Sequence, residues 1–239
     1  MRGKSSEVIF DIVTLPSPPG TFDEQEHPSL CAGPGEDPAE ALHRMSLSPL
    51  TARTLAVAML NPGTGMGRIW YEHPGGGPAE TGDGLIKTLP ATEEEMLTEF
   101  WAAVMRFQRL ITFNGRQFDC PFLMLRSALL GVPPSRNLIP YRFSAREHCD
   151  LLDQLTFYGA TRKFTLEAYC SGFGIRRAGG EPGRPDFSRL IEEGRNKEIA
   201  EYAAGTVRAT AELYRRWEGS LSFRRGAGGT FLHRFPSSK

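Results

Sequence analysis

The chain has no net charge, no long apolar run and few cysteines, and each absence excludes a class of protein. Lys plus Arg and Asp plus Glu both number 28 in 239 residues, so no global field draws the protein toward nucleic acid or a membrane. The four cysteines lie far apart without a CxxC pair, which argues against a disulfide framework and a structural zinc site. No run approaches the roughly 18 apolar residues of a membrane helix, and the start of the chain lacks an apolar signal core. We therefore expect a soluble, cytoplasmic protein without a membrane partner.

The apolar patterns predict strands first and helices later. The turn signal "NPGTG" joins two β-rich runs into a hairpin, and "RLITF" follows the first helix as another strand. The expected strands cover residues 7–12, 54–60, 67–73 and 109–113. With 40% apolar residues the chain can bury a full core, so we expect a single α/β domain.

Helix signals dominate the second half of the sequence. Thr92 and Glu95 form a capping box before an amphipathic stretch, and an Asn-Gly pair separates the strand at 109–113 from a helix that starts near Asp119. The expected helices cover residues 93–107, 119–131, 147–159, 165–174, 186–194 and 196–219.

Charge is unevenly distributed along this neutral chain. Residues 5–43 contain no Lys or Arg but eight acids, and residues 16–50 are rich in Pro and Gly. Residues 16–50 are either a solvated, partly disordered acidic insertion or an acidic flap that covers a basic groove and competes with anionic ligands. We expect a domain over 1–217 with this insertion, followed by a basic tail over 218–239. The C-terminal cations are Arg215, Arg216, Arg224, Arg225, Arg234 and Lys239.

Three residues occupy positions that are typical of an α/β active site. Asp11 lies in the first strand, Asp119 follows a strand–loop junction, and Tyr202 lies on the last helix. Such side chains can meet at the carboxyl ends of strands. Taken singly, each also has a structural explanation, as a loop contact, a helix cap and a core aromatic, so the residues alone leave the question open.

Four segments, taken together, carry a family resemblance. They are "FDIVTLP", "LITFNGRQFDCPFLMLRS", "HCDLLDQLTFYG" and "EYAAGTVRATAELY". In order and spacing, from about Glu7 to Trp217, they resemble the tyrosine-type 3′–5′ exonucleases of the DEDD superfamily, and most closely the stand-alone exonucleases related to the proofreading domain of B-family DNA polymerases. The most specific motif contains Asn114, Phe118, Asp119 and Pro121. The resemblance implies a ribonuclease H-like fold, a mixed β-sheet flanked by helices.

The resemblance also implies a catalytic set, of which two carboxylates are missing. Asp11 would bridge two Mg²⁺ or Mn²⁺ ions, Asp119 would serve the second ion, and Tyr202 would orient the attacking water. The family's other Glu and Asp are replaced here by Val13 and Thr206. Two-ion hydrolysis needs carboxylate oxygens, so we expect Asp11 and Asp119 to bind metal weakly or not at all.

Basic and aromatic residues of the same segments point to single-stranded nucleic acid. We predict that Asn114, Arg116, Phe118 and Phe122 contact single-stranded DNA or RNA, since cations interleaved with aromatic rings suit such a ligand. Further cations come from segments that border the substrate groove in the family. They are Arg126, Arg142, Arg146, Arg162 and Lys163.

Three functions therefore stand as hypotheses. We prefer a degenerate exonuclease-family protein that binds single strands with little or no hydrolysis. The first alternative is an active exonuclease that recruits Asp150 or Glu201, although Asp150 and Asp153 lie on one face of the expected helix and are equally explained as solvated. The second is a protein-interaction module with a protein partner, which the acidic insertion favours.

Overall fold

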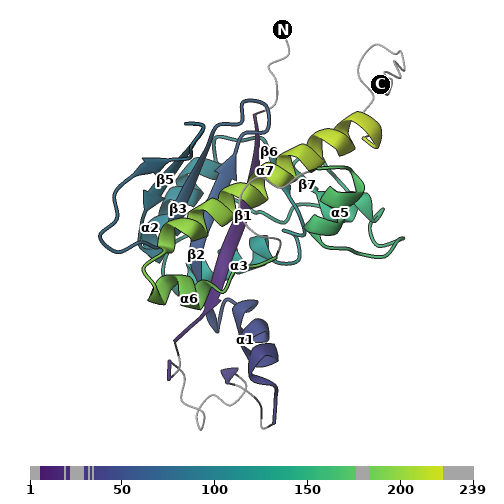
Figure 1. Ribbon diagram of the computed structural model, residues 1–239. Helices are drawn as coiled ribbons and strands as arrows, with labels where there is room; N and C mark the ends of the chain where they lie inside the picture. Colours follow the sequence, from purple (N-terminus) through teal and green to yellow (C-terminus); the bar gives the residue numbers. More distant parts are fainter. Residues whose placement is uncertain are drawn as a thin grey trace.

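A mixed β-sheet forms the centre of the molecule (Figure 1). The computed structural model describes residues 6–18, 20–21, 30–31, 33, 35–175 and 183–222. Within this part of the chain the sheet has seven strands in the order β4-β5-β3-β2-β1-β6-β7. They are β1 (Glu7–Pro16), β2 (Ala52–Leu60), β3 (Gly67–Tyr71), β4 (Ala79–Glu80), β5 (Ile86–Pro90), β6 (Arg109–Thr112) and β7 (His148–Asp150). β1 pairs antiparallel with β2 and parallel with β6, so the predicted α/β class is confirmed.

Helices cover both faces of this sheet. They are α1 (Pro38–Ser46), α2 (Glu93–Val104), α3 (Asp119–Leu129), α4 (Leu151–Leu155), α5 (Leu166–Gly172), α6 (Phe187–Glu192) and α7 (Asn196–Ser220). The long helix α7 packs across β1, β2 and β3 (Figure 1), while α2 and α3 enclose a second core. None of the described helices is long and apolar enough to span a membrane.

The alternation of side chains along β1 decides which residues face α7. Val8, Phe10 and Ile12 pack into the core beside α2. Ile9 and Val13 pack into the core beside α7. Because successive strand residues point to opposite faces, Asp11 shares the α7 side with Val13. The strand thus directs both positions toward the last helix.

The first long helix and the helix after β6 form as their local signals predict. In α2 the Thr92 side chain accepts the Glu95 amide and the Glu95 carboxylate accepts the Thr92 amide, which completes the capping box. α3 stops before Gly131, whose φ of 73° is one that residues with a Cβ rarely adopt. Trp101 Nε1 donates to Ser127 Oγ at 2.8 Å and joins the two helices.

The structure corrects the predicted helix over 147–159. Residues 148–150 form the strand β7, parallel to β6, and only 151–155 are helical. β7 is three residues long and buried throughout, so it has no alternating pattern that reveals a strand. The strands β4, within the Gly-rich segment 73–84, and β5, just after it, were also not predicted. Pairing with β3 stabilises β5.

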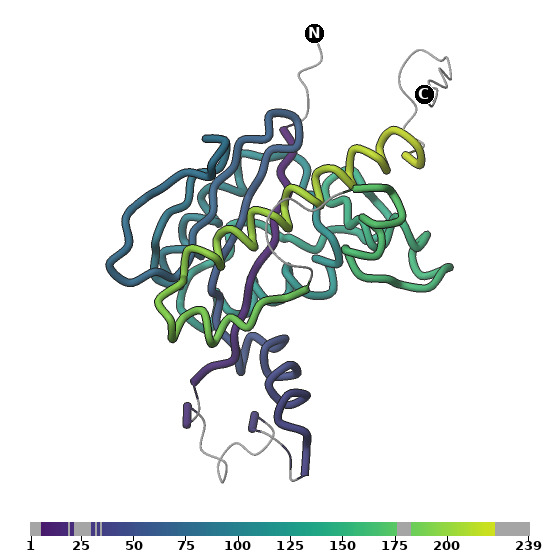
Figure 2. Tube along the Cα trace, viewed as in Figure 1, coloured from purple at the N-terminus to yellow at the C-terminus, as the bar shows by residue number. Residues whose placement is uncertain are grey.

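Part of the insertion after β1 forms a helix that the sequence did not predict. β1 itself extends to Pro16, and Pro38–Ser46 forms α1, which packs against β1 at one end of the molecule (Figure 2). The Asp37 carboxylate starts α1 by accepting the amides of Ala39 and Glu40. The acidic residues Asp23, Glu24 and Glu26 lie outside the described residues, so the flap hypothesis is not tested.

The predicted boundary between domain and tail falls inside a helix. α7 continues to Ser220, because Trp217 is 4% exposed and anchors its last turns in the core. Arg215 and Arg216 therefore belong to α7, where both pair with Glu212. The other C-terminal cations, Arg224, Arg225, Arg234 and Lys239, lie outside the described residues.

Candidate functional site

A cleft of about 270 Å³ lies between the carboxyl half of β1 and α7. The β6–α3 loop, the start of α5 and the segment before α6 complete its walls. Six positions that the sequence singled out line this cleft: Asp11, Val13, Asn114, Phe118, Tyr202 and Thr206. Of the three residues expected to converge, Asp11 and Tyr202 line this cleft and Asp119 does not.

A larger hollow of about 530 Å³ lies along the C-terminal half of α7 and contains none of these residues. Its cations are engaged by neighbouring acids: Arg208 pairs with Asp83, and Arg215 with Glu212. We therefore place the candidate site in the smaller cleft.

Helix α7 presents Tyr202 and Thr206 on one face because they are four residues apart. Thr206 is 8% exposed, and its hydroxyl donates to the Tyr202 carbonyl oxygen at 3.1 Å. The Tyr202 ring meets Phe187 edge to face with centroids 5.3 Å apart. The hydroxyl of Thr206 thus bonds to its own helix, at the position where the family resemblance implies a carboxylate.

Val13 closes the opposite wall of the cleft. It is 3% exposed and packs in the core beside α7. Neither Val13 nor Thr206 provides a carboxylate, and among the described residues no three His, Cys, Asp or Glu side chains form a group able to hold a metal ion. The residues present do not fit the two-ion arrangement that the resemblance implies.

Asp119 joins β1 to α3 from a buried position. Its side chain is 3% exposed, and Oδ1 accepts the backbone amide of Ile12 at 3.0 Å. Burial raises the pKa of Asp119 well above its usual value, and the nearby charge of Asp11 raises it further. Asp119 therefore keeps its proton more readily than an exposed aspartate.

The Asn-Gly pair before α3 is required by local geometry. Asn114 has a φ of 62°, in the left-handed region that Asn tolerates better than most residues. A Cβ at Gly115 would lie 2.5 Å from the Thr112 side chain, so only glycine allows this approach. The turn directs Asn114 to the cleft, and Phe118 follows it there.

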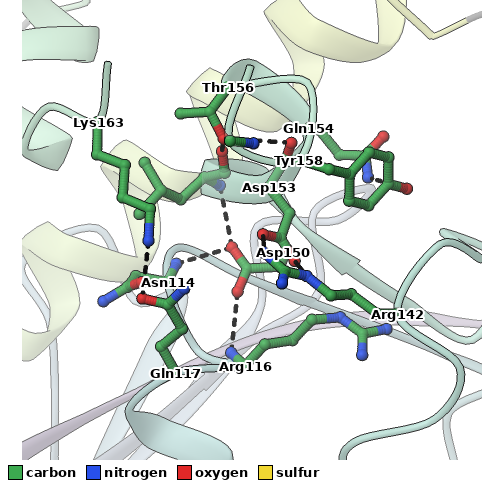
Figure 3. Close-up of polar contacts among 12 residues, drawn as sticks. Asn114, Arg116, Gln117, Arg142, Asp150, Asp153, Gln154, Thr156, Tyr158 and Lys163 are labelled. Carbon is green, nitrogen blue, oxygen red and sulfur yellow. Dashed lines mark hydrogen bonds and ion pairs between the residues drawn. The ribbon is translucent and has the colours of Figure 1, made fainter. Parts of the chain in front are cut away.

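Asp150 holds this turn in place from the end of β7 (Figure 3). Its Oδ1 accepts the amides of Asn114 at 2.9 Å and Leu152 at 3.0 Å, and its Oδ2 accepts the amide of Arg116 at 2.9 Å. Asp150 is 2% exposed, and burial raises its pKa although the amides act in the opposite direction. It is neither solvated nor a lining residue of the cleft, so its predicted role as a substitute metal ligand is not supported.

The other acids considered as replacements also lie elsewhere. Asp153 is 6% exposed and accepts Arg142 Nη2 at 2.6 Å, so the expectation of a solvated carboxylate is wrong (Figure 3). Glu201 is exposed on α7 and does not line the cleft.

Two residues predicted to contact nucleic acid are buried instead. Arg116 is 8% exposed, and its guanidinium donates to the Pro140 carbonyl oxygen at 2.7 Å. Phe122 is 1% exposed and packs in the core beside α2. We correct both predictions, because an interior guanidinium and an interior ring present no surface to a strand.

Comparison with known proteins shows the family of this chain. A family described as "Predicted 3'-5' exonuclease related to the exonuclease domain of PolB" matches residues 84–222, more than half of the chain. The chain belongs to this family of predicted exonucleases. No curated protein sequence matches it.

The fold of this family member resembles that of a solved structure. The family B DNA polymerase of the hyperthermophilic archaeon Pyrobaculum calidifontis matches with a TM-score of 0.58 at 17% identity. The match covers 90% of this chain and 25% of that polymerase, so the chain spans a quarter of its neighbour's length. The predicted ribonuclease H-like architecture is confirmed by this likeness, which at such identity concerns the fold alone.

Sequence reasoning missed several residues of this exonuclease-family cleft. Glu167 from α5, Arg184 and Phe187 around the start of α6, and Phe113 after β6 also line it. Phe113 directly precedes Asn114 in the quoted segment "LITFNGRQFDCPFLMLRS", so the sequence could have identified it. Arg184 and Glu167 belong to no recognisable motif, and only the fold brings them to β1.

Proposed function

We propose that the protein is a degenerate member of its exonuclease family that binds the ends of single-stranded DNA or RNA and hydrolyses them slowly or not at all. One observation carries this proposal. The cleft keeps Asp11, Asn114 and Tyr202 on its walls, while Val13 and Thr206 stand where two carboxylates are implied. A cytoplasmic location stays a prediction from the cysteine spacing.

The chemistry of the cleft argues against efficient hydrolysis. Two-ion phosphodiester cleavage requires acidic oxygens that hold both cations and neutralise their charge. Val13 offers a packed isopropyl group, and the Thr206 hydroxyl bonds within its helix.

The rings of the cleft and the cations at its rim favour a single strand as ligand. Phe113 and Phe118 line the cleft and are partly exposed. Just before the lining residue Thr165, Arg162 lies over the Phe164 ring at 5.2 Å, and Phe164 is 49% exposed. Unpaired bases stack on such rings while cations contact the phosphates.

The test is binding of labelled single-stranded DNA and RNA oligonucleotides, measured by fluorescence anisotropy over a series of salt concentrations. We expect affinity that falls steeply with salt, because phosphate contacts release counterions. Gel analysis of the same samples with Mn²⁺ should show oligonucleotides of unchanged length. A duplex of the same sequence is the control, and weaker binding is expected for it.

Two results would overturn the proposal. Rapid shortening from the 3′ end that Asp11→Asn abolishes would show an active exonuclease. Absence of salt-dependent binding to DNA and RNA would remove the nucleic-acid role and favour the protein-interaction module instead.

A further inference from the structure

Arg184 brings a positive charge into the cleft from the segment before α6. Among the described residues that line the cleft it is the one Lys or Arg. Its Nη2 donates to the Thr14 carbonyl oxygen at 2.8 Å, next to Val13 on β1. The guanidinium is therefore held at the strand end where the resemblance implies metal ions.

Aromatic stacking fixes the other side of this guanidinium. The Arg184 guanidinium carbon lies 5.2 Å from the centroid of the Phe187 ring, and Phe187 in turn packs edge to face on Tyr202. A cation over a ring face is attracted by the ring quadrupole. Arg184 thus packs on Phe187, and Phe187 on Tyr202 of α7.

Two residues of the cleft, Tyr202 and Asp11, favour the charged form of Arg184. Burial lowers the pKa of Arg184, and the charges of Tyr202 and Asp11 act in the opposite direction. Asp11 and Arg184 line the same cleft and carry opposite charges.

We propose that Arg184 is the phosphate-binding cation of this cleft, through which a single-stranded end binds without a divalent ion. The proposal rests on the proposed function and names the residue that carries it. A guanidinium presents five donors in a planar fork that matches phosphate oxygens, and one nitrogen is used on Thr14. The stack with Phe187 orients the guanidinium. Because Val13 and Thr206 provide no carboxylate to hold a metal ion, Arg184 contacts the phosphate directly.

The test is anisotropy titration of a single-stranded oligonucleotide in EDTA and in Mn²⁺, with wild type and Arg184→Gln. Wild type is expected to bind with the same affinity in both buffers. Arg184→Gln is expected to bind roughly tenfold more weakly, because a charge-assisted contact is lost. Its plot of log affinity against log salt should be shallower by about 0.7, the value for one phosphate contact on a single strand.

Two further variants separate recognition from folding. Arg189→Gln removes a cation of α6 that pairs with Glu193 and does not line the cleft, so its binding should equal that of wild type. Arg184→Lys keeps the charge without the fork and should recover part of the affinity and the full salt slope. Thermal melting of each variant identifies any loss of fold.

The outcomes distinguish this inference from the proposed function. Wild-type binding that disappears in EDTA, or Arg184→Gln binding with wild-type affinity and slope, would overturn the role of Arg184 and leave the proposed function standing. Failure of wild type to bind any single strand would overturn both.

Discussion

Asp150 and Asp119 are both buried aspartates on either side of the turn after β6, and their surroundings differ. Asp150 accepts three backbone amides and fixes the turn that carries Asn114. Asp119 accepts the Ile12 amide and lies near the charge of Asp11, beside a cleft that Val13 and Thr206 line. The frame around Asp150 is complete without any ligand, whereas the cleft around Asp11 has uncharged residues at two positions where the family resemblance implies carboxylates.

The frame and the cleft therefore depend on different contacts. Buried amides cost free energy when their acceptor is lost, so the Asp150 network supports folding directly. Val13 and Thr206 lie outside these three hydrogen bonds and line the cleft instead.

The largest expected effect follows from Asp150→Ala. Three buried amides would lose their acceptor, and each unsatisfied group costs about 1–3 kcal/mol, so we expect the free energy of unfolding to fall by at least about 3 kcal/mol. Urea denaturation followed by circular dichroism measures this. Asp150→Asn keeps one acceptor oxygen and should be intermediate. A loss below about 1 kcal/mol for Asp150→Ala would contradict the role of Asp150 in holding this turn.

His148 gives the frame a pH dependence. Its Nδ1 donates to the Leu138 carbonyl oxygen at 2.9 Å, and in the neutral ring Nε2 accepts the Thr112 hydroxyl at 2.8 Å. Burial lowers the pKa of His148 from 6.5 to about 3. In that window the unfolded chain binds the additional proton, so stability falls as the pH is lowered from about 6.5 toward 3.

The contribution of His148 is isolated by a variant. We expect wild type to lose about 1.4 kcal/mol per pH unit more than His148→Gln below the unfolded pKa. Urea midpoints measured between pH 7 and pH 4 give both slopes. Parallel slopes would mean that the ring is not held neutral in the folded state.

The next effect concerns the cleft, through Val13→Glu combined with Thr206→Asp. Two carboxylates at the implied positions should let the cleft hold divalent cations, and we expect Mn²⁺ affinity to rise at least about tenfold over wild type. Isothermal titration calorimetry measures it, and each single substitution is the matched control. Equal affinities in wild type and a folded double variant would show that the lost carboxylates are not the missing ligands.

The smallest expected effect is that of Phe164, at the rim of the cleft, on the affinity for a single strand. Phe164 is 49% exposed beneath Arg162, so Phe164→Ala should weaken single-strand binding by about fivefold, near the lower limit for one stacked base. Leu129→Ala on α3, which is 50% exposed and outside the cleft, is the control. Anisotropy titrations at one salt concentration compare the two.

Sequence patterns were sufficient where local signals agree with the fold. The capping box at Thr92, the Asn-Gly turn and the spacing of Tyr202 and Thr206 each specify their structure within a few residues. The family resemblance, added to the positions of Asp11 and Tyr202, predicted that both line one cleft.

The remaining features depend on contacts between distant segments. β7 is specified by pairing with β6, and the burial of Asp150 and Arg116 follows from the loops that close over them. Arg184 reaches β1 from 170 residues away in sequence, through one hydrogen bond to Thr14. No periodic pattern encodes such a contact.

The most direct test of the central claim is degradation of a 5′-labelled single-stranded oligonucleotide by the wild-type protein in excess, with Mn²⁺, followed on a sequencing gel. The Val13→Glu, Thr206→Asp protein is run beside it, with Asp11→Ala as the inactive control. The account predicts full-length oligonucleotide with wild type and a ladder of 3′-shortened products with the double variant. A ladder from wild type that Asp11→Ala abolishes would contradict it.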